Sequence, residues 1–406
     1  MASDPLADAV SDQYERWNYP PPIEDLPAWL ETNWQWFDPR HAHRLMWPDR
    51  DYRPSLDILV AGCGTNQAAI IAYTNPEARV VGIDVSSTSL AHHQHLAEKY
   101  ALTNLELHRL PIEEVGALGR DFDLIMSTGV LHHLADPTKG LAALAGCLRP
   151  DGVMALMLYA THGRIGVKIM QSVFDDMAIS KSEEGLGLIR DAIQVLPNQH
   201  PLQSYLQIAP DLADDAGVMD TFLPGRERTY TIDECREFVE SAGLVFQDVF
   251  LKSTYYPPVA TSSSFLSAVA RLPKEQQWSV MQRVTASNAC HFFLACRVDR
   301  PRETYEIDFD HGDPLRYIPS FRKGCAFEGN VLSQSRWQTR LAPAEVALVG
   351  RIDGRRSIAD IVDSAVESGD VDADRAGDAS EAALATFRSL WQRDFVCLGI
   401  PPHEAS

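Results

Sequence analysis

The stretch Leu56-Asp-Ile-Leu-Val-Ala-Gly-Cys-Gly-Thr65, followed by Val80-Val-Gly-Ile-Asp84, decides the fold of this chain. Residues 56–60 are apolar and rich in branched side chains, which predicts a short buried strand that stops at the glycines. A helix pattern follows, and residues 79–83 predict a second buried strand that carries Asp84 to the carboxyl end of the sheet. This order predicts an α/β fold with a doubly wound sheet.

The glycine turn is suited to a nucleoside ligand. Glycines at 62 and 64 lack the Cβ atoms that would keep a ligand away from the backbone, and the next helix offers unpaired N–H groups in its first turn. A carboxylate at position 84 can accept both hydroxyl protons of a ribose. The unit therefore predicts a nucleoside site at the carboxyl edge of the sheet.

A dinucleotide is the less favoured ligand. The dinucleotide fingerprint needs a third small residue for close helix–strand packing, but Gly62-x-Gly64-x-x leads to Gln67. The Tyr-x-x-x-Lys pair of many dehydrogenases is also missing. An NAD(P)-dependent oxidoreductase is kept as the alternative enzyme class.

Further motifs follow at regular intervals. Residues 122–128 form another apolar strand pattern, Val130-Leu-His-His-Leu134 comes directly after it, and Leu148-Arg-Pro-Asp-Gly152 predicts a turn before a strand at 153–158. With the glycine turn and Asp84, these motifs resemble those of class I S-adenosylmethionine-dependent methyltransferases. The resemblance covers residues 50–160 well and extends more loosely to about 300. It implies a seven-stranded, mostly parallel, Rossmann-like sheet and the cofactor S-adenosyl-L-methionine. A nonenzymatic S-adenosylmethionine-binding scaffold is kept as a further alternative.

The resemblance also implies where the cofactor lies. Its amino-acid part is expected over the glycine turn and the end of the fourth strand, its ribose on Asp84, and its adenine after the third strand. Ala61 stands where many members have an acid, and Asn66 where they often have a further glycine. The expected cofactor-binding residues are Tyr14, Ala61, Gly62, Cys63, Gly64, Asn66, Asp84, Val85, Pro111, Ile112, Ser127 and Thr128.

Three residues are candidates for catalysis. Because a sulfonium already activates the methyl group, the protein mainly has to hold the acceptor in line with it. His132 and His133 could act as a general base, because imidazole titrates near neutral pH; the alternative is a packing pair between strand and helix. Tyr159 ends the fifth strand on the acceptor side. We expect no metal.

Composition restricts the partners. A formal net charge of −20 without a dense Lys/Arg run argues against tRNA, rRNA or DNA as the acceptor. The seven cysteines are scattered and form no C-x-x-C pair, which argues against disulfides and structural zinc. Neither a signal peptide nor an apolar run of 18 residues is visible, so we expect a cytoplasmic protein without membrane association.

Three regions are expected along the chain. Residues 1–47 hold five of the eight tryptophans and predict an aromatic helical cap, with a helix at 28–37 and with Tyr14, Trp17 or Tyr19 near the cofactor. Residues 48–300 are expected to form the methyltransferase domain. An insertion at about 160–228, with room for two amphipathic helices, is expected over the acceptor site.

Residues 301–406 predict a small C-terminal α+β domain. Helix patterns at 341–350, 357–366 and 381–393 and a strand at 395–400 follow the order of a winged helix. The segment from 341 onward has no lysine and more acidic than basic residues, which favours a protein contact or a homodimer over DNA. The acceptor stays open between a small metabolite and a protein or peptide side chain.

Overall fold

The computed structural model describes residues 20–258, 262–334, 337–371 and 376–401. These residues group into two compact units. Unit 1 comprises residues 20–37, 54–249 and 279–299, and unit 2 comprises residues 38–53, 250–278 and 300 onward. The grouping places residues 38–53 and 250–278 with the C-terminal residues, whereas the sequence-based division has its boundary at residue 300.

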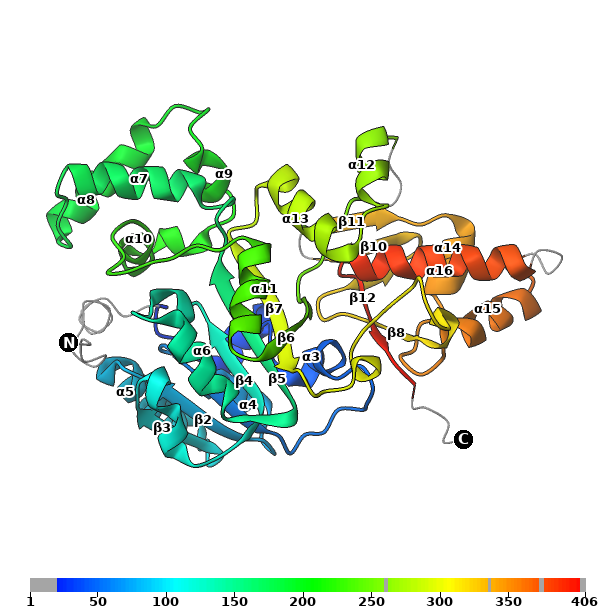
Figure 1. Cartoon of the computed structure of the whole chain (residues 1–406), viewed down its shortest axis with the longest axis horizontal. Coiled ribbons are helices and arrows are strands. Elements are labelled where there is room, and N and C mark those ends of the chain that lie inside the picture. Colours follow the sequence, from blue (N-terminus) through cyan, green and yellow to red (C-terminus); the bar gives the residue numbers. More distant parts are fainter. Residues whose placement is uncertain (1–19, 259–261, 335–336, 372–375, 402–406) are drawn as a thin grey trace. The chain divides into compact units, whose positions relative to one another are not determined.

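Unit 1 is built on a seven-stranded sheet (Figure 1). Its strand order is β3-β2-β1-β4-β5-β7-β6, and only β7 runs antiparallel to its neighbours. The strands are β1 (Asp57–Ala61), β2 (Arg79–Asp84), β3 (Leu105–Arg109), β4 (Phe122–Thr128), β5 (Leu148–Tyr159), β6 (Leu244–Val249) and β7 (Cys290–Arg297). The predicted seven-stranded, doubly wound, mostly parallel sheet is thereby confirmed.

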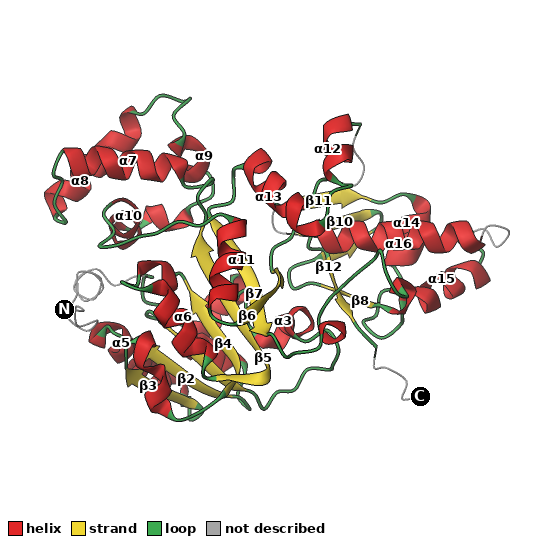
Figure 2. Ribbon diagram, viewed as in Figure 1, coloured by secondary structure: helices red, strands yellow, loops and turns green. Residues whose placement is uncertain are grey.

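Helices cover both faces of this sheet (Figure 2). One face carries α4 (Gln67–Thr74) and α5 (Ser87–Tyr100), and the other carries α6 (Pro137–Ala145) and α11 (Ile232–Ser241) with the short 3₁₀ helix η2 (Ile112–Leu118). Coverage on both faces explains why β1 and β4 are almost wholly buried.

The local signals for helix ends are confirmed. Ser86 Oγ accepts a hydrogen bond from the N–H of Ser89 and caps α5. Thr231 and Glu234 form a reciprocal capping box at the start of α11. Such caps satisfy N–H groups that have no partner inside the helix.

The structure corrects three predictions. The cap helix α2 is Leu26–Thr32 rather than 28–37, since Asp25 caps its start and the chain is extended at Asn33. The turn predicted at 148–152 is the beginning of β5, with a register shift opposite Phe122. The insertion contains four α-helices rather than two.

The insertion forms its own small helical group. It comprises α7 (Ile165–Asp176), α8 (Glu183–Val195), α9 (Leu202–Leu206) and α10 (Asp215–Phe222), with a 3₁₀ turn at 210–213. Phe174, Ile189, Leu202 and Phe222 lie in its buried core. Proline at 197, 201 and 210 breaks the sequence into short helices, which explains the higher helix number.

Unit 2 combines helices with two small antiparallel sheets. Strands β8 (Ile318–Phe321) and β12 (Val396–Gly399) pair, and β9 (Ala326–Glu328), β10 (Val331–Gln334) and β11 (Trp337–Arg340) form a meander. Its helices are α3 (Pro39–Met46), α12 (Ser264–Val269), α14 (Pro343–Val349), α15 (Ile358–Glu367) and α16 (Ala376–Gln392). Helix α13 (Lys274–Thr285) crosses the boundary between the units. The helix, helix, helix, strand order predicted after residue 340 is present.

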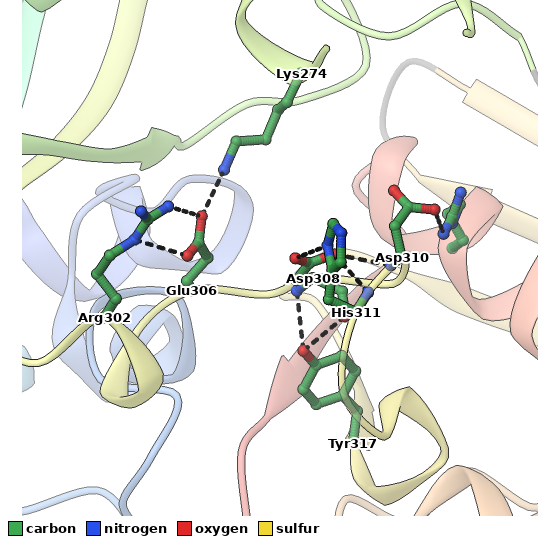
Figure 3. A network of polar contacts seen from close by, with 8 residues as sticks. Lys274, Arg302, Glu306, Asp308, Asp310, His311 and Tyr317 are labelled. Carbon is green, nitrogen blue, oxygen red and sulfur yellow. Dashed lines mark hydrogen bonds and ion pairs between the residues drawn. The ribbon is translucent and has the colours of Figure 1, made fainter. Parts of the chain in front are cut away.

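Polar contacts stabilise the segment of unit 2 that precedes β8 (Figure 3). Glu306 accepts two hydrogen bonds from Arg302 and lies 3.6 Å from the ammonium of Lys274. Asp308 accepts from the backbone N–H groups at 310 and 311 and bonds the ring of His311. The hydroxyl of Tyr317 donates to the carbonyl of Asp308. These contacts hold the segment between residues 302 and 317 in its observed conformation.

Candidate active site

The glycine turn between β1 and α4 has the backbone that its sequence requires. Gly62 and Gly64 have φ values of +71° and +56°, a region that disfavours other residues. The N–H groups of Gly62 and Cys63 both donate to the carbonyl of Ile83, at 2.9 and 3.0 Å. The turn is therefore fixed to the end of β2.

Gly62 is also required by packing. A Cβ atom at this position would lie 2.5 Å and 2.6 Å from the two Cγ atoms of Val130. Val130 begins the Val-Leu-His-His-Leu motif, so two sequence motifs meet here. The side chain of Cys63 is buried beneath the turn, and burial raises the pKa of its thiol. Ala61 is fully buried, so only its backbone can reach a ligand.

Asp84 lies beside the turn, as its position at the end of β2 predicts. Its Oδ2 accepts from the N–H of Gly64 at 2.8 Å, and its Oδ1 accepts from the N–H of Ser86 at 2.9 Å. These two bonds fix the carboxylate beside the glycine turn. Val85 follows it, half-buried, and its carbonyl accepts from Nε of Arg109.

The side chain of Asn66 binds the segment that precedes the sheet. Its amide donates to the carbonyl of Pro21 at 2.9 Å and accepts from the N–H of Ile23 at 2.8 Å. Thr65 adds a hydrogen bond from its hydroxyl to the carbonyl of Pro20. The segment at 20–23 is thereby attached to the glycine turn. Tyr14, Trp17 and Tyr19 lie outside the described residues.

The end of β4 lies at the same carboxyl edge of the sheet. Ser127 Oγ is buried and has no hydrogen-bond partner among the described residues. The hydroxyl of Thr128 accepts from the amide of Gln67 at 3.1 Å, and that amide also lies 3.3 Å from the amide oxygen of Gln35. Sequence reasoning noted Gln67 only as a departure from the dinucleotide pattern and missed Gln35, for which no local signal exists.

Pro111 and Ile112 follow β3 and are both buried. The N–H of Leu110 donates to the carbonyl of Asp84, which holds the end of β3 beside the carboxylate. The carboxyl ends of neighbouring strands thus carry four candidate elements of the site: the glycine turn, Asp84, Ser127 and the segment at 111–112. A nucleoside with an amino-acid tail fits this set, because a carboxylate and a buried hydroxyl without a hydrogen-bond partner among the described residues lie along one edge.

His132, His133 and Tyr159 lie together at the ends of β4 and β5. The His132 ring is 4.0 Å from the Tyr159 ring and 4.3 Å from the His133 ring, measured between centroids. His133 Nδ1 lies 2.6 Å from the carbonyl of Arg226. His132 is 1% exposed, and neither of its ring nitrogens has a hydrogen-bond partner in the part of the chain that the structure describes.

Burial keeps His132 neutral. Desolvation lowers the pKa of its imidazole well below the ordinary value, and the charges of Arg164 and Lys168 act in the same direction. A neutral imidazole has one nitrogen that accepts a proton and one that donates a hydrogen bond. His132 is therefore in the form that can accept a proton, and the same burial makes it a weaker base than a free imidazole.

The insertion contributes residues that sequence reasoning missed. The guanidinium of Arg164 lies 3.7 Å above the Tyr159 ring and donates to Glu227 at 2.8 Å, where both side chains are 1% exposed. Glu227 also binds the ammonium of Lys168 at 2.8 Å. Tyr159 donates from its hydroxyl to Asp220 at 3.2 Å. The ion pairs join the two ends of the insertion, and the contacts of Tyr159 with Arg164 and Asp220 attach the insertion to the end of β5.

The described residues contain neither a metal-binding cluster nor a membrane-spanning helix. Among them no group of three or more His, Cys, Asp or Glu side chains is arranged to hold a metal ion. Within the same residues, no helix is both long and apolar enough to span a bilayer.

Comparison with known proteins finds similar sequences for this part of the chain. Residues 59–154 match the methyltransferase domain family, a range that runs from the glycine turn into β5. An uncharacterized protein of Synechococcus is 28% identical over 80% of this chain and 79% of its own length. Trans-aconitate 2-methyltransferase of Deinococcus radiodurans is 34% identical over 130 residues, which are 32% of this chain and 46% of that enzyme.

Solved structures agree on the fold. PKMT2 from Rickettsia typhi, in complex with AdoHcy, matches with a TM-score of 0.65 at 15% identity over 89% of this chain and 75% of that protein. The sheet order and this match confirm the methyltransferase fold that the motifs predicted. The domain match confirms a methyltransferase with S-adenosylmethionine as its cofactor.

Proposed function

We propose, on the premise that this chain is an S-adenosylmethionine-dependent methyltransferase, that it methylates a nitrogen or oxygen that carries a proton. The observation that carries the proposal is His132, which is buried, neutral and without a hydrogen-bond partner among the described residues. A carboxylate or thioether acceptor needs no base, whereas a hydroxyl or amino group must lose its proton during transfer.

The cofactor is assigned to the carboxyl edge of β1, β2 and β4. The backbone at 61–64 and Ser127 with Thr128 hold its amino-acid part, Asp84 with Val85 holds the ribose, and Pro111 and Ile112 flank the adenine. When bound, S-adenosylmethionine supplies an activated methyl group. The buried Ser127 hydroxyl supports this assignment, because an unpartnered buried hydroxyl costs about 1–3 kcal/mol and a ligand that bonds it recovers that cost.

The acceptor side is assigned to the insertion and the end of β5. His132 accepts the proton of the acceptor group. Ring contacts with Tyr159 and His133 orient the imidazole of His132. Arg164 holds the Tyr159 ring from the insertion, and Asp220 fixes the Tyr159 hydroxyl. Holding an acceptor in line with the methyl group in this way can lower the barrier by about 7–11 kcal/mol.

A protein or peptide side chain is the favoured acceptor. Residues 341–406 have no lysine and an excess of acidic residues, and the β8–β12 pair with α14–α16 follows a winged-helix-like order. An acidic module with its own core, which contains Ile361 and Phe387, suits a basic peptide better than a nucleic acid. A small metabolite is the second candidate, supported by the similarity to trans-aconitate 2-methyltransferase. A carboxylate acceptor of that kind would need no base and would remove the role proposed for His132.

Two experiments test these assignments. The full chain, with tritiated S-adenosylmethionine, should label acid-precipitable, protease-sensitive material in a cell extract; label confined to the metabolite fraction would replace the protein acceptor with the second candidate. With the acceptor known, His132→Asn should lower kcat at least 100-fold while cofactor affinity stays within threefold. Unchanged turnover in this variant would remove His132 from the mechanism.

A further inference from the structure

One face of α7 exposes a continuous apolar row. Ile165, Ile169, Val173 and Met177 are spaced four residues apart, so they follow one side of the helix and its C-terminal end. Their exposed fractions are 46%, 40%, 39% and 59%. Single exposed apolar residues are ordinary, but a contiguous apolar row of this length is typical of an interaction surface.

The opposite face of the same helix is already buried. Val167, Met170 and Phe174 lie in the core of the insertion. Helix α7 is therefore apolar on two sides, and a helix that is apolar around most of its circumference is usually buried on both. The next helix, α8, adds two further exposed apolar side chains, Leu188 and Val195.

Charges beside the row indicate what covers it. Lys168, Ser172 and Asp176 form a second row along the helix, next to the apolar one, with the positive charge at one end and the negative charge at the other. If two copies of α7 pack antiparallel about a two-fold axis near Ser172, Lys168 of each copy faces Asp176 of the other. A parallel pair would place like charges together, which is unfavourable.

We propose that α7 is a self-association surface on which a second copy of this chain packs its own α7 in antiparallel orientation. A surface that meets itself across a two-fold axis must be self-complementary, and both rows meet that condition. Lys168 already binds Glu227 at 2.8 Å, but its side chain is 39% exposed and an ammonium carries three donors, so it can bridge two carboxylates.

The pairing would also act on the candidate active site. Arg164 immediately precedes α7 and lies against Tyr159, so a partner that holds α7 restricts the movement of the acceptor-side residues. This consequence rests on the proposed function, whereas the self-association itself does not. The experiment below therefore measures mass and cross-linking rather than activity.

Sedimentation velocity of the full chain at 1 to 50 μM tests the proposal. We expect a species of twice the 45.1 kDa chain mass, and the double variant Ile169→Glu with Val173→Glu should be monomeric with an unchanged melting temperature. Asp176→Lys should weaken the dimer at least tenfold, because it places Lys168 opposite a lysine. In this charge test, Glu77→Lys, at an exposed position outside the insertion, serves as the surface control.

A cysteine at the axis gives an independent readout. Ser172→Cys should form an intermolecular disulfide under mild oxidation, whereas Ala91→Cys, at an exposed position on α5, should not. A wild-type chain that stays monomeric at 50 μM would overturn the proposal. A dimer that tolerates both glutamates and gives no Ser172→Cys cross-link would overturn it as well, because the copies would then associate through another face.

Discussion

Gly62 and Val130 are in such close contact that the methyl group of an alanine at 62 would lie 2.5 Å from one Cγ atom of Val130. The contact joins the glycine turn after β1 to the segment after β4. It shows that the first glycine of the turn is required by the protein's own packing as well as by any ligand.

Gly62→Ala should therefore be strongly destabilising. The overlap with Val130 costs about 1–3 kcal/mol, and the φ of +71° adds about 1–2 kcal/mol for a residue with a Cβ. Urea unfolding measures the sum. Gly119→Ala is the matched control, since its φ is +61° and nothing lies within 4 Å of the added atom; it should show only the smaller backbone cost. Equal losses in both variants would contradict the packing argument.

Glu227→Met should destabilise the chain by about 3–5 kcal/mol, because it leaves the buried guanidinium of Arg164 without its counter-charge. The double variant with Arg164→Met should lose less than Glu227→Met alone, since no buried charge is then uncompensated. Thermal and urea unfolding measure both. Asp215→Asn breaks an exposed pair with Arg190 and should change stability by less than 1 kcal/mol. A double variant less stable than Glu227→Met would contradict the argument, because Arg164 would then stabilise the chain without its counter-charge.

Buried histidines should make the fold less stable in mild acid. Burial lowers the pKa of His93 and of His291 to about 4, from an ordinary value near 6.5. Between pH 6.5 and 5 the unfolded chain takes up protons that the folded chain does not, so the free energy of unfolding falls as pH falls, by up to about 1.4 kcal/mol per pH unit for each histidine.

Urea unfolding at pH 7.5, 6.5, 5.8 and 5.0 measures this slope. His291→Gln should reduce it, and the same replacement at the exposed His95 should not. A slope that is equal in the wild type and in His291→Gln would show that this histidine does not contribute to the pH dependence.

Local signals in the sequence predicted the framework. The strand that ends at Asp84, the Ser86 cap and the Thr231–Glu234 capping box depend on residues within a few positions of one another, so a single sequence contains them. The association of the glycine turn with Asp84 was predictable because parallel strands bring their carboxyl ends to one edge.

Contacts between distant residues could not be predicted in this way. Asn66 binds the segment at 20–23, Arg164 binds Glu227 63 residues away, and Tyr159 binds Asp220 61 residues away. No periodicity or spacing links such partners. For the same reason, the sequence did not predict that residues 38–53 group with unit 2. Within that unit, Arg44 donates to the carbonyl of the distant Gly354.

The central claim is that Asp84 and the glycine turn bind S-adenosylmethionine, and calorimetric titration of the full chain with S-adenosylmethionine and with NAD tests it most directly. We predict saturable binding of S-adenosylmethionine, at least tenfold weaker in Asp84→Ala and unchanged in Gly119→Ala, with no heat from NAD. Equal affinity in Asp84→Ala and the wild type, or saturable binding of NAD alone, would contradict the account.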